Sequence, residues 1–184
     1  AKNLGSVISS YENIVFEAHS TDYQKPENYK YLVEDHFAIL KVGPQLTFAL
    51  REALYALENI EAHLAEKNKC SRLYETCEDV MLSEPKYWKT FYEGSDEELK
   101  FLRHFSYSDR IRYYWSNPKV LNSVNSLLKN LSSAPIPLTL VSQYLPEQHT
   151  QILNDSLINK PEELIKAKIK SVLNDYSSAC FRKL

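Results

Sequence analysis

Two short apolar segments, a glycine–proline turn and a long helical pattern near the start of the chain constrain the fold most. The segments, Ile14–Ala18 and His36–Val42, lack polar–apolar alternation, which is typical of parallel strands buried on both faces. A helical link from Pro26 separates them, and Gly43-Pro44 opens a helix whose apolar stripe runs to near Glu66. This order of elements predicts a parallel βαβα unit.

The carboxyl ends of these two segments are the places where we expect chemistry, because parallel βα units gather functional groups there. His19 and Asp22 follow the first segment. They can act as a general base with its orienting carboxylate, or His19 can supply one metal ligand. The alternative is a hydrogen-bonded structural histidine. No second histidine stands at ligand spacing, so we predict no metal site and no cofactor in this chain.

Lys41 and Gly43 follow the second segment and are candidates for phosphate binding. In (β/α)8 barrels, loops after the last strands often bind phosphate through backbone N–H groups at a helix N-terminus. A glycine permits close backbone approach, and a lysine adds positive charge. The alternative is that Gly43 only makes the turn and that Lys41 reaches solvent or pairs with Glu17.

The chain length limits what this βαβα unit can be. A (β/α)8 barrel needs about 250 residues, whereas the chain has 184. From residue 68 onward the pattern is helical, with no further βα repeat. Local start signals predict helices capped by Ser71 and by Ser95, one starting at Asn117-Pro118 and one at Lys160-Pro161. Residues 86–92 and the segment from Arg110 to Trp115 are also expected to be helical, and residues 138–144 are ambiguous between strand and helix. The sequence therefore predicts an α/β chain that supplies the last two βα units of a TIM barrel in residues 1–67, followed by a mostly α-helical C-terminal extension in residues 68–184.

Arginine and aromatic residues are concentrated in the segment Ser106–Trp115 of the predicted extension. Its candidate contact residues are Arg110, Arg112, Tyr113, Tyr114 and Trp115. This composition is enriched in protein–protein hot spots and predicts a contact to another subunit or to the barrel domain. Two alternatives stay open: stacked guanidinium and tyrosine groups that pin the extension to the barrel, and a grip on a sugar phosphate.

Composition excludes several classes of protein. Twenty-two basic and 24 acidic residues give a net charge of −2, so there is no basic excess for nucleic acid and no charged tail for a membrane surface. Three glycines nearly exclude a glycine-rich phosphate loop, and three cysteines without framework spacing indicate a reducing, cytoplasmic location.

Several stretches resemble, in order, those of one known family, the non-catalytic Z subunit of D-tagatose-1,6-bisphosphate aldolase. The matching stretches run nearly end to end: Val15–Gln24, Asp35–Pro44, Leu46–Leu54, Glu78–Leu82, Tyr107–Trp115, Ile136–Leu138 and Ser142–Pro146. The resemblance covers this whole chain but only the carboxyl-terminal part of a typical family member.

The resemblance implies a TIM barrel related to class II aldolases and a role in galactitol, N-acetylgalactosamine and tagatose catabolism. The expected partner is a separate, zinc-dependent catalytic subunit, which the Z subunit stabilises and brings to full activity. A further expected partner is the N-terminal barrel segment that this chain lacks. The alternative function is a sugar-phosphate enzyme in its own right, an aldolase or a tagatose-6-phosphate kinase, with a phosphate site at the barrel mouth. No kinase phosphate loop supports the latter label.

Overall fold

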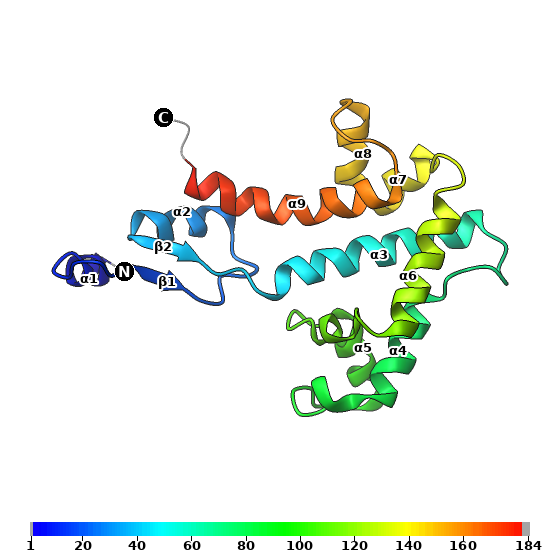
Figure 1. Cartoon of the computed structure of the whole chain (residues 1–184), viewed down its shortest axis with the longest axis horizontal. Helices are drawn as coiled ribbons and strands as arrows, with labels where there is room; N and C mark the ends of the chain where they lie inside the picture. Colours follow the sequence, from blue (N-terminus) through cyan, green and yellow to red (C-terminus); the bar gives the residue numbers. More distant parts are fainter. Residues whose placement is uncertain (1, 182–184) are drawn as a thin grey trace. The chain divides into compact units, whose positions relative to one another are not determined.

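A computed structural model describes residues 2–181 of the chain, which form a mostly helical α/β structure with one small parallel sheet (Figure 1). In chain order the elements are α1 (Lys2–Ile8), β1 (Phe16–Ala18), α2 (Pro26–Glu34), β2 (Phe37–Leu40), α3 (Pro44–Leu64), α4 (Leu73–Ser83), the 3-10 helix η1 (Pro85–Tyr87), α5 (Asp96–Phe105), the 3-10 helix η2 (Arg110–Tyr114), α6 (Pro118–Leu131), α7 (Leu138–Tyr144), α8 (Pro146–Leu153) and α9 (Pro161–Cys180). Among the described residues, no helix is both long and apolar enough to cross a membrane.

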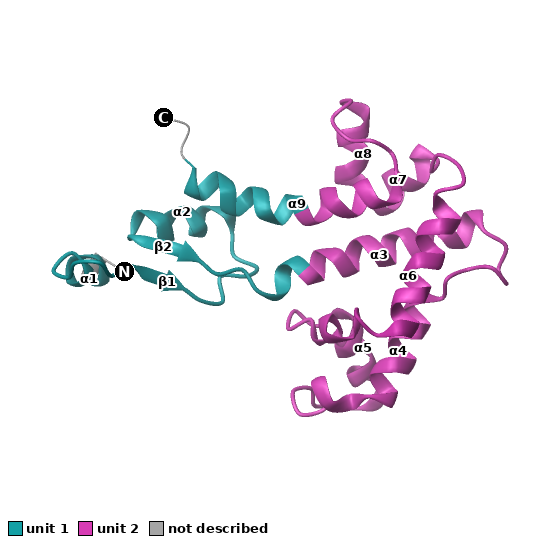
Figure 2. Ribbon diagram, viewed as in Figure 1, with its two compact units in different colours: residues 1–46, 170–184 teal, residues 47–169 magenta. Residues whose placement is uncertain are grey.

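The chain divides into two units, which Figure 2 colours separately. Unit 1 comprises residues 1–46 and 170–184, and unit 2 comprises residues 47–169. Both boundaries fall inside long helices, α3 and α9. The assignment of residues 1–67 to a barrel and of 68–184 to an extension differs from these units and stays a prediction.

The sheet of unit 1 consists of the two predicted strands, paired in parallel. Phe16 lies opposite Phe37, and after an irregularity in register Ala18 lies opposite Leu40. Both strands are shorter than the apolar segments that predicted them. This chain alone does not bury both faces of the sheet, since Ile39 of β2 is 48% exposed and Val15, just before β1, is 60% exposed; burial in a complete barrel stays a prediction. Two strands alone leave both sheet edges without neighbours, so these apolar side chains stay uncovered.

The end of α9 contributes to unit 1 by packing on the loop that follows β1. Tyr29 of α2 is fully buried and its ring stacks on Tyr176 of α9, with the ring centroids 4.2 Å apart. The Tyr176 hydroxyl shares a 2.9 Å hydrogen bond with Thr21, whose own hydroxyl donates to the backbone carbonyl of Lys41 at 3.1 Å. Thr21 thereby connects the loops after β1 and β2.

The main hydrophobic core lies entirely in unit 2. Its fully buried members are contributed chiefly by α3, α4 and α6: Leu57, Ile60, Leu73, Cys77, Met81, Val120 and Leu127. The helices begin where the sequence predicted, because the start signals are local. Ser95 forms a capping box with Glu98 at α5, and the Asn117 side chain accepts the Lys119 N–H at α6.

The start of α4 corrects one prediction. Ser71 was expected to cap this helix, but its N–H and hydroxyl donate to the buried Glu61 carboxylate at 2.9 and 2.5 Å. The cap comes from α3 instead, where both carboxylate oxygens of Glu58 accept the Tyr74 N–H at 3.0 Å. Burial raises the pKa of Glu58, and the backbone hydrogen bond from Tyr74 opposes that rise.

Other elements differ from the sequence pattern in smaller ways. The aromatic stretch after Pro85 forms only the short η1, and the arginine-rich segment forms η2 rather than an α-helix. Residues 138–144, ambiguous in sequence, are helical, and α8 was not predicted.

Left-handed backbone conformations are made mostly by residues other than glycine. Within the described part of the chain, seven non-glycine residues have positive φ: Asn13, Ser20, Tyr23, His36, Arg72, Asp109 and Asp155. Gly94 is the glycine that does so, at φ 143°. A chain with only three glycines therefore turns with residues for which this conformation is unfavourable.

Candidate functional site

The side chains at the strand ends form a small charged group on the surface of unit 1. Glu17 of β1 contacts two of the predicted site residues through one oxygen: His19 Nε2 lies 2.9 Å away and Lys41 Nζ lies 3.6 Å away. All three side chains are well exposed to solvent. Lys41 thus makes the pairing with Glu17 that was the structural alternative to phosphate binding. His19 has its hydrogen-bond partner in Glu17 rather than in Asp22.

Asp22 caps the N-terminus of α3. Its Oδ1 accepts the backbone N–H of Gly43 at 2.8 Å and of Gln45 at 3.0 Å. The side-chain oxygen of Gln45 in turn accepts a hydrogen bond from the Tyr23 N–H at 2.9 Å. A carboxylate of the chain itself therefore holds the helix N-terminus that we predicted for a phosphate, and a ligand there must compete with it.

Gly43 is needed at this turn because of the space that Asp22 takes. A Cβ at position 43 would lie 3.0 Å from Asp22 Oδ2, closer than nearly all side chains tolerate. The glycine thus serves the cap directly. Phosphate binding by Lys41 and Gly43 stays a prediction.

A cavity lies beside the end of β1, and His19 borders it. Its volume is about 380 Å³, and its lining comes from the strand end and α2: Ala18, His19, Ser20, Thr21, Gln24, Asn28, Tyr31, Leu32 and Asp35. Asp22, Lys41 and Gly43 are not part of this lining. The four predicted site residues therefore divide between a cavity wall and a helix cap.

The sequence predicts no metal site in this chain, and that stays a prediction. Among the described residues, no three histidine, cysteine, aspartate or glutamate side chains converge in a way that could hold a metal ion. Zinc in a partner subunit is a separate expectation, which concerns residues of another chain.

The predicted contact segment in η2 makes most of its contacts within unit 2. Tyr114 is buried and its hydroxyl donates to the Glu84 carbonyl at 2.5 Å, while Tyr113 stacks on Tyr87 with centroids 4.9 Å apart. The Arg110 guanidinium lies over the Phe91 ring at 3.3 Å. These contacts are intramolecular, but they lie within the predicted extension. That the segment pins the extension to the barrel stays a prediction.

The remaining two residues of the segment follow the same pattern. Arg112 donates to the backbone carbonyl of Asp109 and to the hydroxyl of Tyr113, at 3.2 and 2.9 Å. The Trp115 indole N–H is buried without a hydrogen-bond partner. A subunit contact through the segment stays a prediction.

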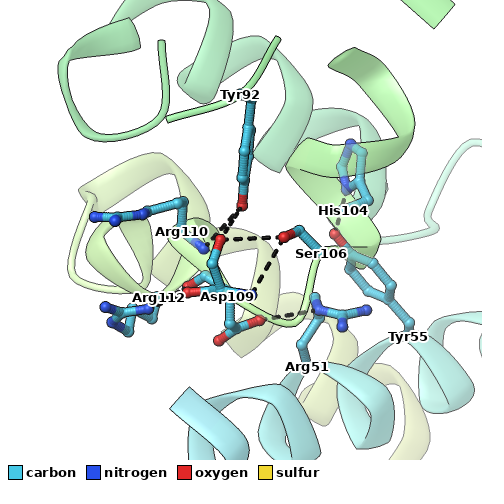
Figure 3. Close-up of polar contacts among 9 residues, drawn as sticks. Arg51, Tyr55, Tyr92, His104, Ser106, Asp109, Arg110 and Arg112 are labelled. Atoms are coloured by element: carbon cyan, nitrogen blue, oxygen red, sulfur yellow. Dashed lines mark hydrogen bonds and ion pairs between the residues drawn. The ribbon is translucent and has the colours of Figure 1, made fainter. Parts of the chain in front are cut away.

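A buried ion pair, missed by the sequence analysis, joins α3 to the residue before η2. Arg51 Nε donates to Asp109 Oδ1 at 3.3 Å, and both side chains are at most 2% exposed (Figure 3). Burial raises the pKa of Asp109, while a hydrogen bond from Thr47 and the Arg51 charge oppose that rise. The ring of Phe48 covers the Arg51 guanidinium at 4.1 Å.

A second buried network links α3, α4 and α5 through His104. Its Nδ1 lies 2.6 Å from the Tyr55 hydroxyl, and its Nε2 lies 3.1 Å from Glu78 Oε2 (the former contact is drawn in Figure 3). Arg103 binds the same Glu78 carboxylate with two nitrogens, at 2.9 and 2.5 Å. The Tyr74 ring stacks on His104 at 3.8 Å.

The charges in this network are set by burial and by Arg103. Burial lowers the pKa of His104 to about 4. Burial acts to raise the pKa of Glu78, but the hydrogen bond and charge of Arg103 outweigh it and leave that pKa low. At neutral pH a neutral His104 therefore donates from Nε2 to the ionised Glu78 and accepts from Tyr55 at Nδ1. The network is largely buried and links three helices.

Comparison with known proteins places the chain in a family. The family model described as D-tagatose-1,6-bisphosphate aldolase subunit GatZ/KbaZ-like matches residues 1–181. A crystal structure of a probable tagatose 6 phosphate kinase from Sinorhizobium meliloti 1021 is similar, with 48% sequence identity and a TM-score of 0.90. The match covers 96% of this chain and 46% of that chain, so this chain spans less than half of that relative.

These matches agree with the stretches that suggested the same family from sequence. The described fold is similar to that of the matched part of the Sinorhizobium protein. The chain belongs to the GatZ/KbaZ-like family of D-tagatose-1,6-bisphosphate aldolase subunits.

Proposed function

We propose that this chain is part of a non-catalytic aldolase subunit that binds a separate class II, zinc-dependent catalytic subunit. In this role it stabilises that partner and brings it to full activity in the breakdown of tagatose 1,6-bisphosphate. The family match over residues 1–181 supports the assignment to an aldolase complex. The proposal that this subunit is the non-catalytic one rests on the side chains at the strand ends.

The observation that carries the non-catalytic role is the engagement of those side chains with the protein itself. A general base needs a partner that orients it towards a substrate. His19 instead contacts Glu17 on the surface, and Asp22 caps α3 through the N–H groups of Gly43 and Gln45. A pair built for proton transfer would leave these groups directed at a shared cavity.

We further propose that unit 1 supplies the last two βα units of a (β/α)8 barrel. Exposed apolar side chains in and next to the sheet support this proposal: Ile14 and Val15, just before β1, are 55% and 60% exposed, and Ile39 of β2 is 48% exposed. In a barrel, each parallel strand has neighbours on both sides and helices on its outer face. Strands from the preceding part of the subunit would cover these side chains.

The experiment adds the complete subunit to its catalytic partner. We expect higher cleavage of tagatose 1,6-bisphosphate per catalytic subunit and a longer half-life of activity on heating. A variant with Asp22→Ala and His19→Ala should support the partner as well as the wild type does, because neither residue takes part in the reaction. Activity and half-life unchanged by the wild-type subunit would refute the proposal.

The alternative is a sugar-phosphate enzyme, and the name of the Sinorhizobium relative, a probable tagatose 6 phosphate kinase, favours testing it. The complete subunit alone should then consume ATP with tagatose 6-phosphate, or cleave the bisphosphate without a partner. His19→Ala and Lys41→Met would lower that rate by orders of magnitude. An inert subunit that still activates its partner decides for the non-catalytic role.

A further inference from the structure

A second cavity, within unit 2, has a wall unlike that of the cavity near His19. It measures about 360 Å³ and lies between α3, the start of α8 and the N-terminal half of α9. Its lining combines aromatic and polar side chains: Phe48, Arg51, Glu52, Tyr55, Phe105, Tyr144, Leu145, Pro146, Glu147, Gln148 and Lys168. The volume suits a molecule of metabolite size.

Two of the lining residues bury hydrogen-bond donors that have no acceptor. Arg51 Nη2 and Gln148 Nε2 are inaccessible to solvent and lack a partner, and their residues are only 2% and 1% exposed. A buried donor without an acceptor is unfavourable, and few occur in folded proteins. Two of them in the wall of one cavity indicate a missing acceptor.

The ion pair with Asp109 leaves the terminal nitrogens of the Arg51 guanidinium available to a ligand. Only Nε reaches Asp109, at 3.3 Å, and Figure 3 shows the terminal nitrogens directed away from that carboxylate. Phe48 covers a face of the guanidinium, so an incoming group must meet its edge. Binding of oxygen atoms in the plane of the guanidinium is the geometry that phosphates and carboxylates adopt with arginine.

The start of α8 adds a third source of donors. Glu147 and Gln148 lie in the first turn of this helix, where backbone N–H groups have no carbonyl one turn back. Leu145 occupies the N-cap position, and its side chain makes no capping hydrogen bond. Both first-turn residues line the cavity, so the positive end of the helix dipole borders the same space.

The acidic residues of the lining do not repel an anion bound at the base of the cavity. Glu52 is exposed and forms a 3.5 Å ion pair with Lys168, and the Glu147 side chain is also exposed. Water screens both carboxylates at the rim, whereas Arg51 and Gln148 act where water is excluded.

We infer that this cavity binds a small oxyanion, a phosphate or carboxylate group of a metabolite-sized compound, through Arg51, Gln148 and the N-terminus of α8. The aromatic rings of Phe48, Tyr55 and Phe105 would pack against the body of that compound. The site is independent of the strand ends and of any catalytic partner. It therefore goes beyond the function proposed above and can fail or succeed separately.

Calorimetric titration of the chain alone tests the inference. Inorganic phosphate and acetate, titrated at constant ionic strength, represent the two oxyanions, and glycerol is the neutral control. We expect saturable binding of phosphate or acetate but not of glycerol. The anion that binds more tightly shows whether the natural ligand carries a phosphate or a carboxylate group. Absence of saturable binding for both anions overturns the inference.

Two variants locate the binding. Gln148→Leu removes one donor, and Arg51→Lys keeps the charge opposite Asp109 while removing the planar edge. Each should weaken anion binding by about tenfold or more. Gln143→Leu, the same change on an exposed face of α7 outside the cavity, should leave binding unchanged. Equal binding by all folded variants overturns the site.

A second measurement holds even where a variant fails to fold. Crystals of the wild-type chain soaked in selenate should show an anomalous peak within hydrogen-bond distance of Arg51 and Gln148. Selenate found only elsewhere, or nowhere, refutes the assignment.

Discussion

The two units bury their side chains in opposite ways. Unit 2 has a continuous apolar core and two buried polar networks, centred on Arg51 and on His104. Unit 1 has a two-stranded sheet whose apolar residues are only partly covered and an ion-pair group at the surface. Within a chain of this length, unit 2 has the interior of an independent domain. Unit 1 has a sheet with partly uncovered apolar side chains, which is what the proposed barrel fragment would show.

The difference predicts which substitutions lower the free energy of unfolding of each unit. In unit 2, removing a buried side chain leaves a void or an uncompensated charge that nothing else can fill. In unit 1, exposed apolar side chains of the sheet such as Ile39 already contact water, so removing one loses little in this chain. Matched substitutions in the two units separate these cases.

The largest effect is expected from Arg51→Met in unit 2. It leaves the Asp109 carboxylate buried without its cation, and breaking such a pair costs about 3–5 kcal/mol of unfolding free energy. Urea unfolding followed by circular dichroism measures this loss. Adding Asp109→Asn should recover part of the stability, because it removes the stranded charge. A double variant no more stable than Arg51→Met would show that the ion pair is not the cause.

Leu57→Ala tests the apolar core against the sheet. Leu57 is fully buried, so we expect a loss of about 2–5 kcal/mol from the lost burial and the cavity left behind. The matched change Ile39→Ala removes a half-exposed side chain and should cost less than about 1 kcal/mol in this chain alone. Equal losses would mean that the sheet is already covered. A larger cost of Ile39→Ala in the complete subunit would support the barrel.

The His104 network predicts a pH dependence of unit 2. Because the pKa of His104 is about 4 in the folded chain and about 6.5 when unfolded, the unfolded state binds the proton first as the pH falls. Stability from this residue is present above pH 6.5 and is lost as the pH falls towards 4. Between pH 7 and pH 5 the loss is about 2 kcal/mol.

The comparison with His104→Gln isolates that contribution from those of Glu78, Glu58 and Asp109, which also titrate. Glutamine keeps one donor and one acceptor but takes up no proton. Urea unfolding at several pH values should show a weaker pH dependence in the variant by about the same 2 kcal/mol. Identical pH profiles would place the titration elsewhere.

The smallest effect is expected from Lys41→Met in unit 1. Its ion pair with Glu17 is exposed, and such pairs contribute about 0–1 kcal/mol. Thermal unfolding at low and high salt measures this contribution. A larger loss in this chain would contradict the view that unit 1 keeps its charged group only at the surface.

The sequence was sufficient for features that depend on nearby residues. Helices α3, α5, α6 and α9 begin at Pro44, after Ser95, at Pro118 and at Pro161, as local start signals predicted. The parallel pairing of β1 and β2 was also predicted, from two apolar segments joined by a helical link. Helix α8 was missed although Pro146 offers the same kind of signal.

Features that depend on distant residues were not predictable from patterns. Arg51 and Asp109 are 58 positions apart, and Glu58 caps a helix that starts well after it. Asp22 was identified as a candidate, but its role as the cap of α3 depends on how the loops after β1 and β2 meet. A hydrophobic periodicity does not show which distant residues meet in the fold. For this reason the sequence predicted Ser71 as the cap of α4, whereas Glu58 caps it.

The scarcity of glycine at left-handed positions gives a protein engineer a route to a more stable chain. Arg72 and Asp155 are exposed, at φ 51° and 53°, where glycine has no steric penalty. Replacing either with glycine should relieve backbone strain by roughly 0.5–1 kcal/mol after the entropy cost of glycine in the unfolded chain. Because both positions lie outside the core, such changes would raise heat tolerance without repacking the interior.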